Sequence, residues 1–362
     1  MNYIFTSESV TSGHPDKVCD AIADRILDSA LSQDVNSKMA VEATIKDNFI
    51  LVYGEANTTA KIDYAKIAQD TLKEIGYEEE FEVLIKVSQQ SNEINSAVCQ
   101  KELGAGDQGL MFGYATNETK ELMPLPITFA HALAYQLECV RRENKILKPD
   151  GKTQVSVEYE NDVPKRIDTI VISTQHTEDA TQEEIKDLLI EKVINPIIDA
   201  KYLDKDTKYL INPSGSFIVG GPFGDSGTTG RKIVVDSYGG VGRIGGGCFS
   251  SKDPSKVDRS AAYYTRYVAK NIVAANLCDR IEIQVAYAIG KSHPVSININ
   301  TFNTNKVSVD KILEVIDNNF DFSVSNIIKE LDLLKPIYHL TSNYGHFGKN
   351  NLPWEKIKEL VI

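Results

Sequence analysis

The sequence predicts an α+β fold of three similar units related by pseudo-threefold repetition, each with helices on one face of a mainly antiparallel sheet. The main observation is that the order helix, β-hairpin, helix occurs three times, with no obvious sequence identity among the copies. The chain has 362 residues, 42% hydrophobic and 25% charged, which suits a globular protein of two or three domains. Chance repetition is the alternative, because such patterns are common.

The first unit begins with a helix near Pro15, since proline suits the first helical turn. One face of this helix carries apolar residues every four positions, and another face carries acids at the same spacing. These residues are Val18, Ile22 and Ile26 on the first face and Asp20, Asp24 and Asp28 on the second. Alternating strands over 39–45 and 49–53 then predict a hairpin, and 63–75 predicts a second helix that stops at Gly76.

The second and third units repeat this order. In the second, a helix over 127–143 precedes strands over 154–159 and 167–173, and a capping box at 181–184 opens a helix that runs to Val193. The third unit has a helix over 257–275, strands over 281–289 and 295–302, and a helix over 309–318. Polar, glycine-containing stretches near 90–107 and 213–250 separate the units. We therefore place an N-terminal domain at 1–98, a central domain at 104–218 and a C-terminal domain at 219–362.

Charge and composition exclude several classes of protein. The 39 basic residues against 51 acidic ones give a net charge of −12, which repels phosphate backbones and anionic membranes. No nucleic-acid or membrane partner is therefore expected. The start of the chain lacks a secretory signal and no segment is apolar enough to span a membrane, so we expect a cytoplasmic protein. The five cysteines are scattered and contain no CxxC, so neither a disulfide framework nor a zinc ribbon is expected.

Glycine and charge gather in one part of the chain. Twelve of the 23 glycines fall between Gly215 and Gly247, and residues 225–259 hold six basic and four acidic residues. Such density weakens packed elements and suits backbone that approaches a ligand closely. Interleaved lysine and arginine suit a polyphosphate, and nearby aspartates suit its Mg²⁺. The alternative is a flexible loop with solvated charges.

Three acidic positions also have two interpretations. His14 and Lys17 lie at a predicted helix N-terminus, where free N–H groups attract anions. Asp16 lies beside them and has two interpretations: its carboxylate binds a metal, or it only offsets the positive end of the helix dipole. Glu42 and Glu55 lie in the first hairpin, either on its wet face or, if buried, facing a cation.

The segment 104–109, GAGDQG, matches the glycine pattern of dinucleotide-binding sites. Its context is wrong, because a polar stretch precedes it and a strand over 110–114 follows. We therefore reject an oxidoreductase of that kind. The histidines show no ligand spacing, and His131 is expected in the core or on the surface.

Taken together, these segments resemble the S-adenosylmethionine synthetase (methionine adenosyltransferase) family over nearly the whole chain. The two most specific are GAGDQGLMFGYATNET at 104–119 and GGGCFSSKDPSKVDRSAAY at 245–263. Further support comes from FTSESV, GHPDK, KPDGKTQV, STQH and GGPFGDSGTTGRKI.

The resemblance implies three similarly folded domains and a dimer with active sites between subunits, commonly paired into a tetramer. It implies that ATP and L-methionine give S-adenosylmethionine and that the triphosphate is then cleaved to phosphate and pyrophosphate. Methionine sulfur has no proton to lose, so an SN2 attack at ribose C5′ needs no general base. It needs alignment and stabilisation of the leaving triphosphate.

The resemblance also implies the site residues. The catalytic set is His14, Lys152, Arg231, Lys232, Lys252 and Lys256. ATP is expected to contact His14, Asp150, Lys152, Ser216, Phe217, Asp225, Arg231, Lys232, Cys248 and Lys252. Methionine is expected among Glu55, Gln90, Asp107, Asp225, Lys256 and Ile289, with Glu55, Gln90 and Asp107 coming from the partner subunit. Asp16 and Asp258 are expected to hold Mg²⁺, two ions per site, and Glu42 is expected to hold K⁺.

The chain departs from the family pattern at a few positions. Ser251 stands where glycine is usual, Cys248 where alanine is usual, and Ile244 where a histidine is common. The segment between Gln90 and Asp107 is shorter than in many members, which puts the gating of the site in doubt. A silent member with a regulatory or scaffold role is the other alternative, but none of the charged site residues is lost.

Overall fold

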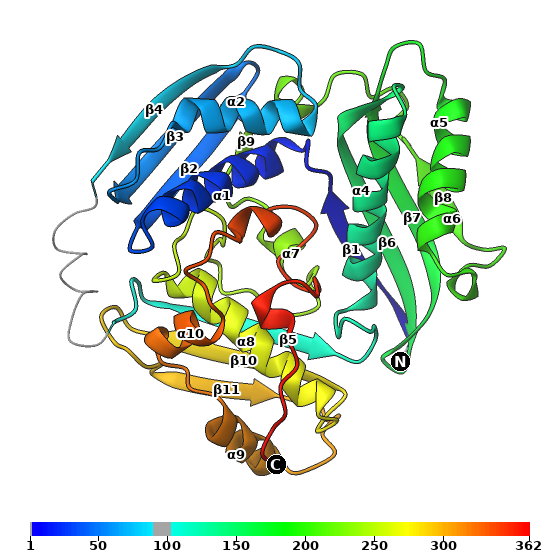
Figure 1. The fold of residues 1–362 in the computed structure, drawn as a ribbon. Coiled ribbons are helices and arrows are strands. Elements are labelled where there is room, and N and C mark those ends of the chain that lie inside the picture. Colours follow the sequence, from blue (N-terminus) through cyan, green and yellow to red (C-terminus); the bar gives the residue numbers. More distant parts are fainter. Residues whose placement is uncertain (1, 90–102) are drawn as a thin grey trace.

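Over residues 2–89 and 103–362, the part of the chain that the computed structural model describes, three β-sheets are each covered by helices (Figure 1). Helices and mainly antiparallel sheets form distinct layers, which confirms the α+β class. The expected gating segment and Gln90 lie outside the described residues.

The first sheet has the order β4-β3-β2-β9. Its central hairpin, β2 (Lys38–Lys46) and β3 (Phe49–Asn57), is antiparallel, whereas β4 (Glu82–Ser88) runs parallel to β3. Helix α1 (Pro15–Gln33) packs on β2 and α2 (Tyr64–Ile75) packs on α1. The second helix ends as predicted, because Gly76 takes the left-handed conformation at φ 113°.

The second sheet has the order β1-β6-β7-β8. Its elements are β1 (Asn2–Val10), α4 (Leu125–Glu143), β6 (Leu147–Glu160), β7 (Val163–His176), α5 (Gln182–Leu189), a π-turn (Ile190–Ile194), α6 (Asn195–Ile197) and β8 (Lys208–Ile211). Helix α4 covers β1 and β6. The predicted capping box opens α5, with Thr181 and Glu184 each bonding the other's backbone N–H.

The third sheet has the order β11-β10-β5 and is antiparallel throughout. Its elements are β5 (Gly109–Thr116), α8 (Val257–Ala274), β10 (Arg280–Tyr287), β11 (Ser296–Asn300), α9 (Val309–Asn319) and α10 (Val324–Glu330). The remaining short elements are β9 (Gly227–Thr228), α7 (Ile233–Asp236) and 3₁₀ turns at Ala200–Tyr202, Gly221–Phe223, Tyr338–Leu340 and Pro353–Glu355.

Each sheet borrows its outer antiparallel strand from a distant part of the chain. Strand β1 pairs with β6 of the second hairpin, β5 with β10 of the third, and β9 with β2 of the first. The exchange is cyclic, so the three hairpins are tied together by backbone hydrogen bonds. In Figure 1, β1 lies in the second sheet and the chain runs directly from it into α1. The start of that helix therefore lies between two sheets.

The predicted helices and hairpins are confirmed to within a few residues. Strand β6 begins at Leu147, seven residues earlier than predicted, because a register shift before Gly151 lets Pro149 and Asp150 sit in the strand. The prediction ran the first strand of the third hairpin to Ile289, but β10 ends at Tyr287. Strand β1 was not predicted, since its partner β6 lies about 150 residues away in the sequence.

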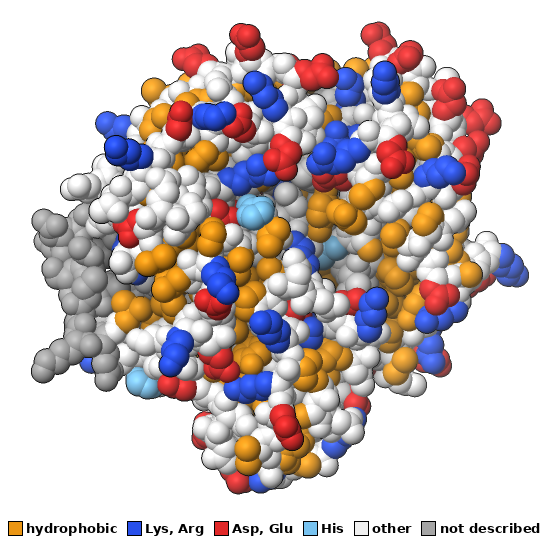
Figure 2. All heavy atoms as spheres, in the orientation of Figure 1, with side chains coloured by type: hydrophobic (Ala, Val, Ile, Leu, Met, Phe, Trp, Pro, Cys, Tyr) orange, Lys and Arg blue, Asp and Glu red, His pale blue; other side chains and the backbone are white. Residues whose placement is uncertain are grey.

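One hydrophobic cluster surrounds α1 and α8, and another lies between α4 and the second sheet. None of the helices in the described ranges is long and apolar enough to cross a membrane. The face drawn in Figure 2 has acidic and basic side chains interspersed. The four cysteines within the described ranges are free.

A buried charge cluster fastens α8 to the C-terminal segment. The Arg266 guanidinium donates to both carboxylate oxygens of Glu355 at 2.9–3.0 Å and to the carbonyl oxygen of Tyr114 at 2.9 Å. Lys270 Nζ donates to the same carboxylate at 2.7 Å. All three charged side chains are at most 5% exposed, so each depends on the others for compensation.

We expect Glu355→Ala to lower the free energy of unfolding by about 3–5 kcal/mol, because it leaves two buried cations without a counter-ion. Urea unfolding followed by circular dichroism measures this loss. Glu359→Ala removes an exposed acid of the same segment and should leave the midpoint unchanged. Equal midpoints for the two variants would contradict the prediction.

Candidate active site at the start of helix α1

The chain before α1 lies against the start of β6. Thr11 N–H and Oγ1 donate to the carbonyl oxygens of Gly151 and Pro149 at 2.9 and 2.7 Å. Tyr77 Oη donates to the carbonyl oxygen of Gly13 at 2.6 Å. These bonds bring the sequence-predicted residues His14, Asp150 and Lys152 together, although about 135 residues separate them in the chain.

His14 is the N-cap of α1 and is 3% exposed. Its Nδ1 accepts the Asp16 N–H at 3.2 Å, so the neutral ring carries its proton on Nε2. Burial and the charge of Lys232 lower the pKa of His14 to about 3, against the opposing effect of Asp16. At neutral pH His14 is therefore an uncharged hydrogen-bond donor.

Asp16 lies in the first turn of α1 and binds two parts of the glycine-rich stretch. Its Oδ1 accepts the Thr228 N–H at 2.9 Å, and its Oδ2 accepts from Lys232 Nζ at 2.6 Å. Arg231 lies 3.7 Å from the same carboxylate and is largely exposed. Burial opposes ionisation of Asp16, but the hydrogen bonds from Lys232 and Thr228 lower its pKa below the usual value.

Asp150 faces the start of the glycine-rich stretch. Its Oδ2 accepts the Gly221 N–H at 2.8 Å, while its buried Oδ1 has no partner in the described structure. Burial raises the pKa of Asp150 to about 6, and the Gly221 bond and Lys152 oppose the rise. Asp225 is exposed, and its N–H donates to the Gly221 carbonyl oxygen at 3.0 Å.

A second group of predicted residues surrounds the start of α8. Lys252 Nζ donates to Asp258 Oδ2 at 2.5 Å. Glu42 on β2 accepts from Tyr53 Oη at 3.1 Å. Burial raises the pKa of the Cys248 thiol, the charge of Lys252 opposes the rise, and the charges of Glu42 and Asp258 add to it.

The two groups are adjacent. A Cβ built on Gly230 would lie 2.5 Å from Cys248 Cβ, so the segment leading to Arg231 and Lys232 touches the segment leading to Lys252. Two neighbouring loops and the first turns of α1 and α8 thus carry four lysine and arginine side chains and two aspartates: Arg231, Lys232, Lys252, Lys256, Asp16 and Asp258. The last of the lysines, Lys256, is paired with buried Asp253 at 2.5 Å.

Two of the glycines are needed for close approach to the protein itself. A Cβ on Gly245 would lie 1.8 Å from the Leu110 carbonyl oxygen, and one on Gly247 would lie 2.3–2.5 Å from the Asp258 carboxyl group. We expected these glycines to admit a ligand. The structure shows that they seat the loop on β5 and against Asp258.

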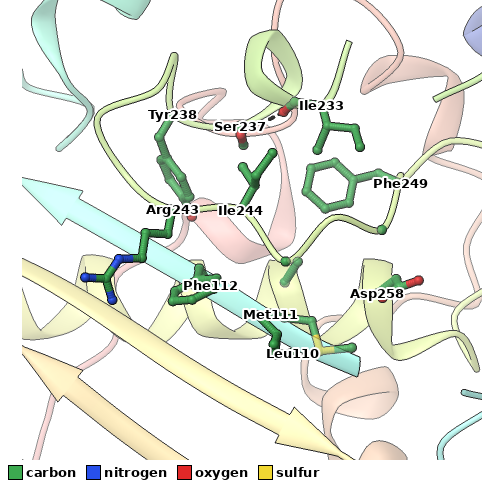
Figure 3. A pocket seen from close by; sticks show the side chains of 13 residues that line it. Leu110, Met111, Phe112, Ile233, Ser237, Tyr238, Arg243, Ile244, Phe249 and Asp258 are labelled. Atoms are coloured by element: carbon green, nitrogen blue, oxygen red, sulfur yellow. Dashed lines mark hydrogen bonds between the residues drawn. The ribbon is translucent and has the colours of Figure 1, made fainter. Parts of the chain in front are cut away.

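A small pocket lies between this loop and β5, with Asp258 and Ala262 of α8 completing its lining (Figure 3). Ile244 and Phe249 face Leu110 and Met111 of β5 across it, with Asp258 at one edge. Its lining is mostly apolar, so it supports the loop rather than offering a phosphate site. Ile244, one of the residues that differ from the family pattern, adds apolar surface to this pocket.

The other predicted residues of the described ranges are more exposed. Glu55, Asp107, Ser216 and Ile289 are exposed, and Phe217 is half-buried. Glu55 lies opposite Ala40, which bridges to Lys252 on its other side. The turns carrying Asp107 and Ile289 are joined by the bond from Gly290 N–H to the Ala105 carbonyl oxygen at 2.9 Å.

No group of three or more histidine, cysteine or acidic side chains within the described ranges is arranged to hold a metal. Asp16 and Asp258 each offer one carboxylate beside a lysine. This donor set fits Mg²⁺, which proteins often bind through one or two carboxylates together with substrate phosphates.

Sequence reasoning missed the role of the remaining acids of α1. Asp20 Oδ1 accepts the Gly230 N–H at 2.8 Å, and Asp24 accepts from Ser250, Ser251 and Arg259. Both side chains are fully buried. Their four-residue spacing on a helix with apolar residues on its other faces was the available signal.

Cations, neutral donors and carboxylates from three loops thus define a site of the kind that binds a small polyanion. Comparison with protein families agrees with such a site and identifies the class of protein more closely. Residues 2–100, 102–217 and 219–356 match the N-terminal, central and C-terminal domains of S-adenosylmethionine synthetase, so the chain belongs to this family.

Curated relatives match over nearly the whole chain. The S-adenosylmethionine synthase of Sorangium cellulosum (strain So ce56) is 52% identical over 98% of this chain and 87% of its own length. That of Clostridium botulinum (strain Alaska E43 / Type E3) is 50% identical over 99% of this chain and 98% of its own length.

Because its pKa is lowered to about 3, His14 should stay neutral, with its proton on Nε2, from pH 8 down to about pH 4. Nitrogen chemical shifts of the labelled imidazole, assigned with His14→Gln, measure both the pKa and the tautomer. Exposed His293 serves as the internal comparison. A His14 titration near pH 6.5 would contradict the assignment.

Gly247→Ala should displace the Asp258 carboxyl group, because the added Cβ would lie within 2.5 Å of it. We expect a large loss of turnover and a lower thermal midpoint. Gly246→Ala is the comparison, since its Cβ meets open space and the change adds only backbone strain at φ 93°. A greater loss of turnover in Gly246→Ala than in Gly247→Ala would argue against the steric explanation.

Proposed function

We propose that the cationic loops around the start of α1 bind the triphosphate of ATP while methionine attacks the ribose C5′. The chain forms S-adenosylmethionine from ATP and methionine, as its family membership and its near-complete match to synthases indicate. The convergence of loops 228–232 and 248–258 on α1 is the structural observation that supports this placement.

The phosphate chain is assigned to the lysine and arginine side chains of these loops and of β6. They are Lys152, Arg231, Lys232, Lys252 and Lys256. Two of these lysines are paired with Asp16 and Asp258, which balance their positive charge while no polyanion is bound. Positive charge fixed before the reaction stabilises the leaving triphosphate without reorganisation.

His14 is assigned to the oxygen where the C5′–O bond breaks. Its neutral Nε2–H donates to negative charge that grows on the leaving oxygen. No base is needed, since the methionine sulfur carries no proton. Hydrolysis of the triphosphate to phosphate and pyrophosphate would follow at the same cations.

The nucleoside is assigned to the rim formed by Asp150, Ser216, Phe217, Asp225 and Cys248. Methionine is assigned to Asp225 and Lys256, together with Glu55, Gln90, Asp107 and Ile289. Carboxylates near the sulfur favour the sulfonium product through their negative charge.

Asp16 and Asp258 would hold two Mg²⁺ ions, and Glu42 would hold K⁺. Bound Mg²⁺ would supply neutralisation of the triphosphate charge. Rearrangement of the Lys232–Asp16 and Lys252–Asp258 pairs toward the phosphates would free the carboxylates for the metal.

Exposure of Glu55, Asp107 and Ile289 supports a dimer in which one subunit completes the other's site, and such dimers would pair into a tetramer. The cyclic strand exchange supports a pseudo-threefold relation of the three units. In this arrangement α1, α4 and α8 are equivalent helices.

Incubation of the purified protein with ATP, L-methionine, Mg²⁺ and K⁺ should yield S-adenosylmethionine, phosphate and pyrophosphate, separated by chromatography. Omission of Mg²⁺ should abolish the product, because the triphosphate charge is then uncompensated. A folded protein that forms no S-adenosylmethionine would overturn the proposal.

Lys252→Ala should lower kcat by about 100-fold or more, since it removes a preorganised cation from the leaving group. Its circular dichroism spectrum should match the wild type. Lys186→Ala, which removes an exposed lysine of α5, is the matched control. Unchanged turnover in Lys252→Ala would remove this residue from the mechanism.

A further inference from the structure

Helix α1 carries four buried aspartates in one row, one turn apart: Asp16, Asp20, Asp24 and Asp28, exposed by 2%, 0%, 0% and 9%. Residues four apart lie on the same face of a helix. Asp16 and Asp20 accept backbone N–H groups from the loop at 228–230, Asp24 from the loop at 250–251, and Asp28 from the segment at 338–339. The row therefore fixes the spacing of those loops along the helix axis.

The loop with Arg231 and Lys232 is held at three points. Asp16 accepts the Thr228 N–H at 2.9 Å, and Asp20 accepts the Gly230 N–H at 2.8 Å. Lys17 Nζ bridges Asp20 at 2.9 Å and Asp236 at 2.5 Å, which holds the far end of the same segment.

The loop with Lys252 is held by Asp24. Its carboxylate accepts from Ser250 Oγ at 2.9 Å and from the Ser251 N–H at 3.1 Å. The Arg259 guanidinium donates to both of its oxygens at 2.7 and 2.9 Å, beside Asp258. One carboxylate thus holds the chain on either side of the Lys252–Asp258 pair.

Ser251 shows why this loop needs holding. Its φ is 82°, a left-handed conformation that costs a residue with a Cβ conformational energy, and its buried Oγ has no hydrogen-bond partner in the described structure. The Asp24 bond to its N–H compensates for this conformation. Glycine, usual in the family at this position, would adopt it without strain.

We propose that Asp20 and Asp24 are positioning residues that set the distance between the two phosphate-binding loops, one helical turn apart on α1. The inference rests on the phosphate-binding roles proposed for Lys232 and Lys252. It adds that these roles depend on acids that touch neither substrate. Asp28, which accepts the N–H groups of Tyr338 and His339, belongs to the same row but holds a segment without phosphate-binding residues.

The test compares Asp20→Asn and Asp24→Asn with Asp28→Asn, each measured well below its thermal midpoint. All three replace a buried carboxyl group that accepts backbone N–H bonds, so all should lose stability. We expect kcat to fall by about 10- to 100-fold in the first two, as a misplacement of about 1 Å can cause. The affinity of these two variants for inorganic triphosphate in the presence of Mg²⁺, measured by calorimetry, should also fall. Asp28→Asn should keep a kcat near that of the wild type.

If Asp24→Asn fails to fold because Arg259 loses its partner, two further variants still test the inference. Ser250→Ala removes one bond to Asp24 and leaves the ion pair intact; it should lower kcat to a smaller extent at a nearly unchanged thermal midpoint. Ser251→Gly should raise the midpoint with turnover kept, and in the Asp24→Asn background it should restore part of the lost kcat.

Equal loss of kcat in Asp24→Asn and Asp28→Asn would overturn the inference. If Asp24→Asn does not fold, wild-type kcat in Ser250→Ala would overturn it. Lys252→Ala separates this failure from failure of the proposed function. If Lys252→Ala is inactive while Asp24→Asn turns over normally, positioning alone is refuted. If Lys252→Ala is fully active, the phosphate-binding assignment itself is wrong.

Discussion

The burial of four carboxylates along α1 is the constraint on which the rest of the structure depends. A carboxylate removed from water is costly unless hydrogen bonds and cations compensate for the lost hydration. Here backbone N–H groups of three loop segments supply part of that compensation, and Lys17 of α1, Lys232 and Arg259 of α8 supply the rest. Because each of the four carboxylates accepts at least one backbone N–H group from outside the helix, helix and loops must assemble together.

The same principle operates elsewhere in the chain. Glu355 joins Arg266 and Lys270, and Asp253 joins Lys256 with the Met39 N–H at 2.8 Å. Such pairs give a loop-rich region definite positions that hydrophobic burial alone does not provide, because hydrophobic packing is not directional. The chemistry of the site requires such definite positions, because the cations that bind the triphosphate stabilise it best when they are fixed in place before it leaves.

Much of the fold could be predicted from local pattern. The helices at 15–33, 64–75 and 257–274 follow from apolar periodicity and from their caps, both of which act over a few residues. The partners of β1, β5 and β9 could not be predicted, because each pairs with a strand far along the chain. The glycine-dense stretch at 215–247 was interpreted as backbone that approaches a ligand, and only the positions of β5 and Asp258 showed what Gly245 and Gly247 touch.

The sequence by itself determined the family, the residue types of the site and the need for a polyanion-binding pocket inside an acidic protein. Motif identity carries this information, since the type and order of the side chains are fixed by the sequence. The tertiary structure alone decided that Lys232 and Lys252 lie on neighbouring loops, that His14 is neutral, and that Asp20 and Asp24 are buried beneath those loops. These properties depend on distance and desolvation, which exist only once segments far apart in the chain have packed together.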